Sequence, residues 1–149
     1  MHSKVTRTAP STGSAAFTVA WERPNQFRKV LSNVGSFTNI RGGHAYPEII
    51  LANSKKPIRI FLSVGDRDSL NPNVMRDGMH DWVEANNRMA HVLAAKGYAY
   101  QYLFCQSSGH GLGNARPQIL PGALEWLWRG YEPSGRYPPR LALHGAGRY

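Results

Sequence analysis

The sequence predicts an α/β protein with a mostly parallel sheet and flanking helices. Strand-like and helix-like segments alternate along the 149 residues, which is typical of strand–helix–strand units. The run from Ile58 to Val64, IRIFLSV, is almost continuously apolar, as in a parallel strand that is buried on both faces. These two observations together favour a layered α/β arrangement.

The first part of the chain divides into a helix, a strand, a loop and a short helix. Residues 15–21, AAFTVAW, predict a helix that ends before Pro24, because proline disfavours helix in the residue that precedes it. Residues 29–37, KVLSNVGSF, predict a short buried strand that Gly35 ends. The glycine pair and the proline in residues 38–47 predict a loop, and the next seven residues predict one or two helical turns.

The second part of the chain follows the strand over residues 58–64 with a helix, a strand and a final helix. Residues 82–97 are amphipathic and end in Gly97, which suits a helix C-cap. Residues 98–105 predict a strand, residues 106–117 a loop, and residues 121–131 a helix with its proline near the start. The side chains expected to face the core are Trp82, Ala85, Met89, Val92, Leu93, Leu124, Trp126, Leu127 and Trp128.

The expected organisation is one folded domain over residues 1–131 and a disordered tail over residues 132–149, which are rich in Pro, Gly and Arg. No apolar run approaches the roughly 20 residues of a membrane span. The N-terminus has no apolar signal region, so a cytoplasmic location is the default expectation. Cys105 is the only cysteine, which excludes an intramolecular disulfide and predicts a small buried side chain.

The charge of the chain raises a different class of function. The formal net charge is +9 and the pI is about 10.1, values that are common among nucleic-acid-binding proteins. The basic residues are scattered, however, and no helix face repeats Lys or Arg. We therefore expect no specific nucleic-acid partner and no membrane partner, and a basic polyanion-binding module remains the alternative from another class.

Three groups of reactive side chains stand where an open α/β sheet places its active site, at the carboxyl ends of strands. Ser11 precedes the first helix, Asp66 and Asp68 follow the strand over residues 58–64, and His110 follows the strand over residues 98–105. A serine hydroxyl needs an imidazole to take its proton, and a carboxylate holds that imidazole in the right tautomer. The chain order Ser, Asp, His is that of the α/β-hydrolases.

Each of these residues also has an ordinary structural interpretation. Ser11 suits a helix cap, the two aspartates suit a turn, and His110 suits a surface loop. The glycines support the catalytic interpretation. Gly109 and Gly111 are expected to let the loop bend His110 back toward the serine, and Gly13 to permit close backbone approach.

Several stretches resemble one family, the enterochelin-esterase-like esterases of the esterase D group. These are GSFTNIRGGHAYP, KKPIRIFLSVGDRD and the run ending in SSGHG, and the resemblance covers about residues 11 to 131. It implies a serine carboxylesterase with an α/β-hydrolase fold, acting on ester-linked small molecules without a cofactor. It also implies Ser11 as nucleophile, Asp68 as acid with Asp66 as second choice, and His110 as base. His44 is expected to be a loop or substrate-side residue.

The resemblance is to the C-terminal half of that family only. A partial α/β-hydrolase fold with the N-terminal strands missing is therefore expected, and with it the loss of one oxyanion-hole donor. The family's elbow usually reads Gly-x-Ser-x-Gly-Gly, whereas residues 9–14 read APSTGS. An exposed sheet edge would favour self-association. A catalytically inactive, truncated remnant of such an esterase is the alternative to an active enzyme.

Overall fold

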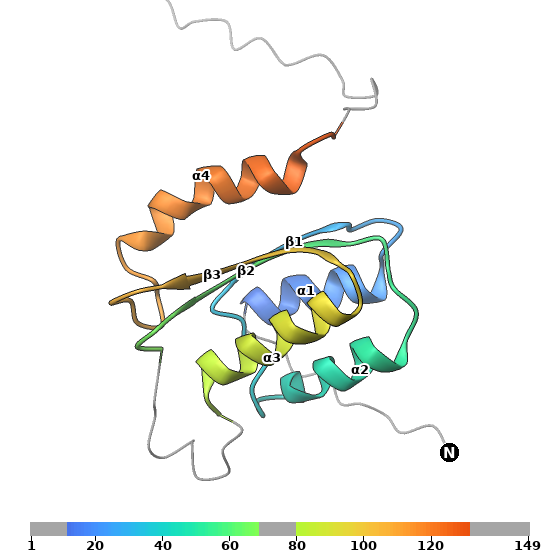
Figure 1. Cartoon of the computed structure of the whole chain (residues 1–149), viewed down its shortest axis with the longest axis horizontal. Coiled ribbons are helices and arrows are strands. Elements are labelled where there is room, and N and C mark those ends of the chain that lie inside the picture. The colour runs from blue at the N-terminus through green and yellow to red at the C-terminus, as the bar shows by residue number, and fades with distance from the viewer. Residues whose placement is uncertain (1–11, 69–79, 132–149) are drawn as a thin grey trace, which may run out of the picture.

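The computed structural model describes residues 12–68 and 80–131, and within them a sheet of three parallel strands forms the centre of the fold (Figure 1). The strands are β1 (Lys29–Asn33), β2 (Arg59–Gly65) and β3 (Ala99–Cys105), in the spatial order β1-β2-β3. Their first residues lie side by side, because Lys29 is paired with Arg59 and Arg59 with Ala99. The prediction of an α/β protein with a parallel sheet is confirmed.

Helices cover both faces of this sheet (Figure 1). One face carries α1 (Thr12–Glu22), α2 (Tyr46–Ala52), which follows the short 3-10 helix η1 (Gly43–Ala45), and α3 (Trp82–Ala95), and the other carries α4 (Ala115–Trp128). The crossovers from β1 to β2 and from β2 to β3 step in the same direction. Since such crossovers are right-handed, α2 and α3 are placed on the same face.

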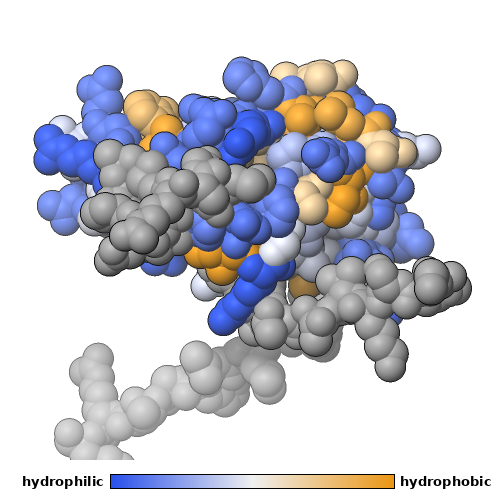
Figure 2. All heavy atoms as spheres, turned by 90° about the horizontal axis from the view of Figure 1, so that it is seen from below, coloured by the Kyte–Doolittle hydropathy of each residue, from blue (hydrophilic) through white to orange (hydrophobic). Residues whose placement is uncertain are grey.

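The main core lies between the sheet and the helices α1 to α3. Alternate residues of β2, Ile60 and Leu62, are fully buried against Phe17, Met89 and Leu93. The outer surface of this helical layer is mainly hydrophilic, with smaller apolar areas between (Figure 2). Ile60 and Leu62 point into this core, and Phe61 between them points to the opposite face of the sheet. The strand β2 is thus buried on both faces, as expected.

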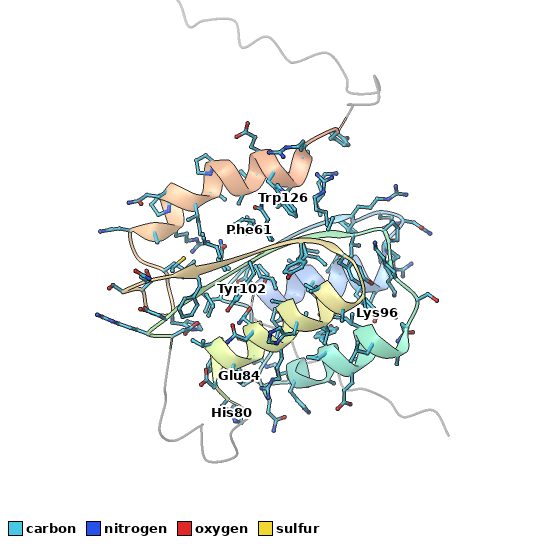
Figure 3. All side chains as sticks on the ribbon, in the orientation of Figure 1. Phe61, His80, Glu84, Lys96, Tyr102 and Trp126 are labelled. Atoms are coloured by element: carbon cyan, nitrogen blue, oxygen red, sulfur yellow. The ribbon has the colours of Figure 1, made fainter. Side chains whose placement is uncertain are left out.

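A smaller core lies under α4. Phe61 points from β2 toward Ala123, Leu127 and the half-buried Trp126, whereas Tyr102 of β3 lies on the other side of the sheet (Figure 3). The edge strands of the described sheet are β1 and β3, since each pairs only with β2 there.

Most elements fall where the sequence predicts them. The first helix begins at Thr12 rather than Ala15 and ends before Pro24. Four of the five core positions of α3 are buried, and the fifth, Val92, is half-buried. Gly97 has a φ of 65° just after α3, a conformation that favours glycine.

The loop prediction over residues 38–47 is correct only in part. Pro47 belongs to the first turn of α2 and not to the loop. Proline is tolerated there because the first amide groups of a helix have no partner inside it.

The prediction for the last helix is wrong at its start and on one of its faces. The helix α4 begins at Ala115, and Pro121 lies inside it. Leu127 is buried as predicted, but Leu124 and Trp128 are 40% and 46% exposed. The face that meets the sheet carries Ala123 and Leu127, four residues apart, and each following residue is rotated by about 100° away from it.

Candidate active site

The loops that follow β2 and β3 are joined by backbone hydrogen bonds at the carboxyl edge of the sheet. The amide of Arg67 donates to the carbonyl of Ser108 at 3.0 Å, and the carboxylate of Asp66 accepts the amides of Ser107 and Ser108 at 2.9 and 3.0 Å. The bond from Ser107 is the main cause that lowers the pKa of Asp66 below its ordinary value. Asp66 thus anchors the second loop to the first.

Gly65 allows the two loops to approach this closely. A Cβ atom at this position would lie 2.1 Å from the carbonyl oxygen of Ser108, a distance that no side chain can adopt. The amide of Asp68 then donates to the carbonyl of Gly65 at 3.1 Å, which closes a tight turn after β2. The glycine and this turn together bring Asp68 under the loop that carries His110.

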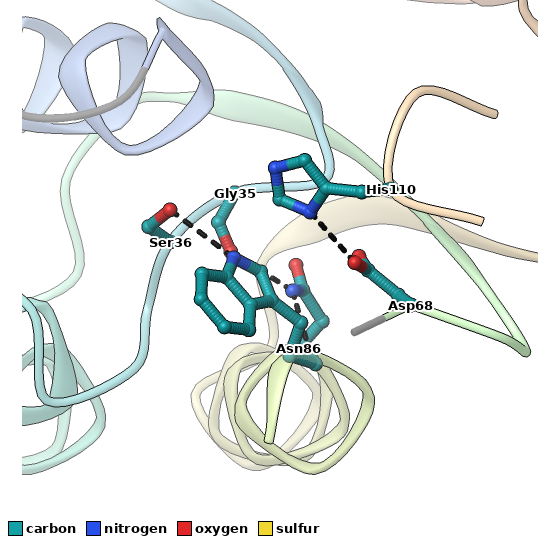
Figure 4. A network of polar contacts seen from close by, with 6 residues as sticks. Gly35, Ser36, Asp68, Asn86 and His110 are labelled. Carbon is teal, nitrogen blue, oxygen red and sulfur yellow. Dashed lines mark hydrogen bonds and ion pairs between the residues drawn. The ribbon is translucent and has the colours of Figure 1, made fainter. Parts of the chain in front are cut away.

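Asp68 and His110 form the polar pair at the centre of this site (Figure 4). The Nδ1 atom of His110 lies 2.6 Å from Oδ1 of Asp68, and the Asp68 side chain is 0% exposed while that of His110 is 55% exposed. Burying a carboxylate costs free energy unless the charge is paired, so the contact with His110 explains how Asp68 can be buried here. With Asp68 ionised, Nδ1 donates the hydrogen bond and Nε2 is left as a proton acceptor.

Trp82 of α3 packs against the histidine of this pair, and Asn86 links α3 to the segment after β1; the sequence alone does not indicate either role. The ring of Trp82 meets the ring of His110 edge-on, with centroids 5.4 Å apart, and its Nε1 donates to the hydroxyl of Ser36 at 3.1 Å. Asn86 is fully buried and donates to the carbonyls of Gly35 and Trp82. The available signal was an asparagine on the apolar face of a helix, one turn after Trp82.

A hollow of about 280 Å³ opens beside His110. Three parts of the fold meet there: the start of α1, the end of β1 and the loop before α4. Its lining residues are Thr12, Gly13, Leu31, Asn33, Val34, His110, Gly111 and Arg116. The hollow is therefore large enough for a small group and contains both apolar and polar walls.

The backbone is strained at the wall of this hollow. Val34 has a φ of 53°, a conformation that is unusual for a β-branched residue, and its amide donates to the carbonyl of Ser63 at 2.7 Å. The neighbouring Asn33 accepts a bond from the Ser63 hydroxyl at 2.7 Å. Strain of this kind persists only where the surroundings enforce it, and it is concentrated at functional sites.

The glycines expected to bend the histidine loop do not shape it. Gly109 and Gly111 do not have positive φ values, and a Cβ atom at either would meet nothing within 4 Å. The left-handed residues of this loop are Ser107, Leu112 and Gly113. The loop is therefore shaped by its bonds to Asp66 and by the buried side chain of Leu112 rather than by the two glycines.

The predicted nucleophile, Ser11, lies just outside the described residues, and so does the predicted tail over residues 132–149. The residues directly after the serine are described, and Thr12 and Gly13 line the same hollow as His110. A Cβ atom on Gly13 would lie 2.7 Å from Oγ of Ser32 and 2.9 Å from Cα of Gly35. Glycine is therefore needed at position 13 for close packing against Ser32 and Gly35, whereas the predicted approach to the serine elbow lies outside the described residues.

The other reactive residues do not line the hollow beside His110. His44 lines a separate hollow of about 400 Å³ together with Glu48 and Arg88. Cys105 is buried, as predicted, and burial followed by the charge of Asp66 raises the pKa of its thiol. Within residues 12–68 and 80–131, no three His, Cys, Asp or Glu side chains are grouped as metal ligands would be.

Comparison of the chain with protein-family models, with curated proteins and with solved structures found no match. In the part of the chain that the structure describes, no helix is long and apolar enough to cross a membrane. The functional argument thus depends on the geometry of the site and on the sequence motifs.

Proposed function

We propose that this chain is a serine carboxylesterase-like hydrolase that cleaves ester-linked small molecules, built on part of an α/β-hydrolase fold. The observation that carries the proposal is the 2.6 Å contact between His110 Nδ1 and Asp68 Oδ1, with the carboxylate buried and the imidazole open to solvent. A buried acid that orients an accessible histidine is the arrangement a catalytic base requires.

The reaction follows from the roles of the three side chains. Nε2 of His110 takes the proton of the Ser11 hydroxyl while its oxygen attacks the ester carbonyl, and Asp68 stabilises the imidazolium that forms. The same nitrogen then gives the proton to the departing alcohol as the carbon–oxygen bond breaks. A water molecule, activated in the same way, releases the carboxylic acid and restores the serine.

The start of α1 offers a partner for the negative charge that develops on the carbonyl oxygen. The first amides of a helix have no acceptor within it, and the amide of Thr12 directly follows the proposed nucleophile. Leu31 and Val34 give the adjoining hollow apolar walls, and Asn33 and Arg116 add polar groups. A short acyl or alcohol group of an ester would fit this space.

The proposal is tested by hydrolysis of a short-chain p-nitrophenyl ester by the full chain, beside Ser11→Ala and Ser54→Ala. Ser54 is exposed and stands apart from the hollow, so its substitution is a matched control. We expect the Ser11 variant to lose activity and the Ser54 variant to keep it. Equal rates in all three proteins would contradict the proposal, and a folded but inactive parent would favour the inactive remnant instead.

A further inference from the structure

A second hollow, of about 310 Å³, lies at the opposite edge of the sheet from His110. The three strands begin there side by side, at Lys29, Arg59 and Ala99, and the C-terminal end of α4 covers them. The two hollows share no lining residue. The second hollow is therefore a separate feature of the fold.

Four cationic side chains line this second hollow, and none of its lining residues is acidic. The cations are Arg28, Lys29, Arg59 and Arg129. Like charges that line one hollow repel one another, and the repulsion is relieved when a group of opposite charge enters. The remaining walls are formed by Pro57, Ile58, Ala99, Leu127, Gly130 and Tyr131.

Two of the four cations are fixed in place by the end of α4 and the residues that follow it. Arg59 donates through Nη1 to the carbonyls of Trp126 and Arg129 at 2.9 and 3.0 Å, which offsets the negative end of that helix. The ammonium group of Lys29 lies 4.7 Å from the ring centroid of Tyr131 and 5.5 Å from that of Trp128. These contacts hold both charges at the hollow before any ligand arrives, which lowers the entropic cost of binding.

The other two cations, Arg28 and Arg129, are exposed and line the same hollow. A guanidinium group presents a planar set of donors that matches the oxygen atoms of a phosphate group. The hollow thus combines two fixed positive charges with two accessible phosphate-binding side chains. Its volume is at the lower end of the range for small-molecule sites.

We propose that this hollow binds a small, multiply charged phosphate compound, such as a phosphomonoester or a diphosphate. Four basic residues and no acidic residue line the hollow, which suits a multivalent anion. The volume of about 310 Å³ fits a small molecule, whereas the backbone of a nucleic acid would need a continuous basic track. This site is independent of the proposed ester hydrolysis.

The test is calorimetric titration of the full chain with inorganic pyrophosphate at low salt, beside two variants that each lose two positive charges. Arg28→Gln/Arg129→Gln removes the accessible pair. Arg41→Gln/Arg88→Gln is the matched control, because neither residue lines the hollow. We expect Kd to rise about tenfold or more in the first variant and to stay within about twofold in the second, with unchanged thermal unfolding in both.

Three results would overturn the proposal. The parent chain could fail to bind pyrophosphate, or both variants could weaken binding equally, which would mean that only the overall charge attracts the anion. A short single-stranded oligonucleotide, titrated in parallel, could bind through Arg28 and Arg129 when pyrophosphate does not. That last result would assign the surface to nucleic acid.

Discussion

Replacing Asp68 by asparagine tests the pair that the proposed chemistry depends on. The substitution keeps the size of a side chain that is 0% exposed but removes its charge. It also lets the side-chain amide donate to Nδ1 of His110, which moves the imidazole proton to Nε2. That nitrogen could then no longer take the proton of a serine hydroxyl.

The expected loss of activity follows from the electrostatics of the pair. Two opposite charges about 4 Å apart interact by about 4 kcal/mol near a protein surface and by about 1 kcal/mol in bulk water. Asp68 is buried and His110 is half exposed, so the upper part of this range applies. A loss of about 3 to 4 kcal/mol in the transition state corresponds to a fall in kcat of roughly 10²- to 10³-fold.

The assay compares kcat for a p-nitrophenyl ester in Asp68→Asn and Asp66→Asn, with folding of both variants checked by circular dichroism. Asp66 is two positions away and binds the amides of Ser107 and Ser108, not the histidine. We expect Asp66→Asn to keep at least about a third of the activity, because its amide oxygen still accepts a hydrogen bond. Parent-like activity in folded Asp68→Asn would refute the reasoning.

Further predictions concern the loops around this pair. Gly65→Ala places a methyl group 2.1 Å from the Ser108 carbonyl, so urea unfolding should show a loss of about 1 to 3 kcal/mol, whereas Gly109→Ala faces open space and should change stability little. An equal loss in both would show that the clash is not its cause. Because the pKa of Asp66 is lowered in the folded state, its stabilising effect is complete above the ordinary value of 3.8 and is lost as the pH falls through the lowered value. Urea midpoints from about pH 5 to pH 2 should therefore fall less steeply in Asp66→Asn than in the parent, and parallel curves would contradict this. Since burial raises the pKa of Cys105, its thiol should react with a disulfide reagent much more slowly in the folded chain than in urea, and equal rates would be inconsistent with its burial.

The sequence was sufficient to predict the layered fold because its signals are local. The apolar run from Ile58 to Val64 and the periodicity of α3 each reflect burial that recurs at a fixed spacing. The start of the final helix differs from the prediction because Pro121, a residue typical of a first helical turn, lies inside the helix. The helix begins at Ala115, before that proline. Its buried face is the one whose residues pack on Phe61.

The candidate site was predictable in part for the same reason. The positions of Asp68 and His110 after consecutive strands placed them at one edge of a parallel sheet, which the structure bears out. The choice between Asp66 and Asp68 as the partner of His110 depended on contacts between two loops, which no local pattern encodes. The contacts of Trp82 with His110 and of Asn86 with Gly35 likewise arise only when α3 packs against the loops.

The most direct test of the proposed function is labelling of the purified full chain with a fluorophosphonate probe, mapped by peptide mass spectrometry. Such probes react with serines that a neighbouring base activates. The account predicts a label on Ser11 that is lost in Ser11→Ala and strongly reduced in His110→Ala. An unlabelled Ser11 in a folded chain, or a label that persists without His110, would contradict the claim that the His110–Asp68 pair activates a serine.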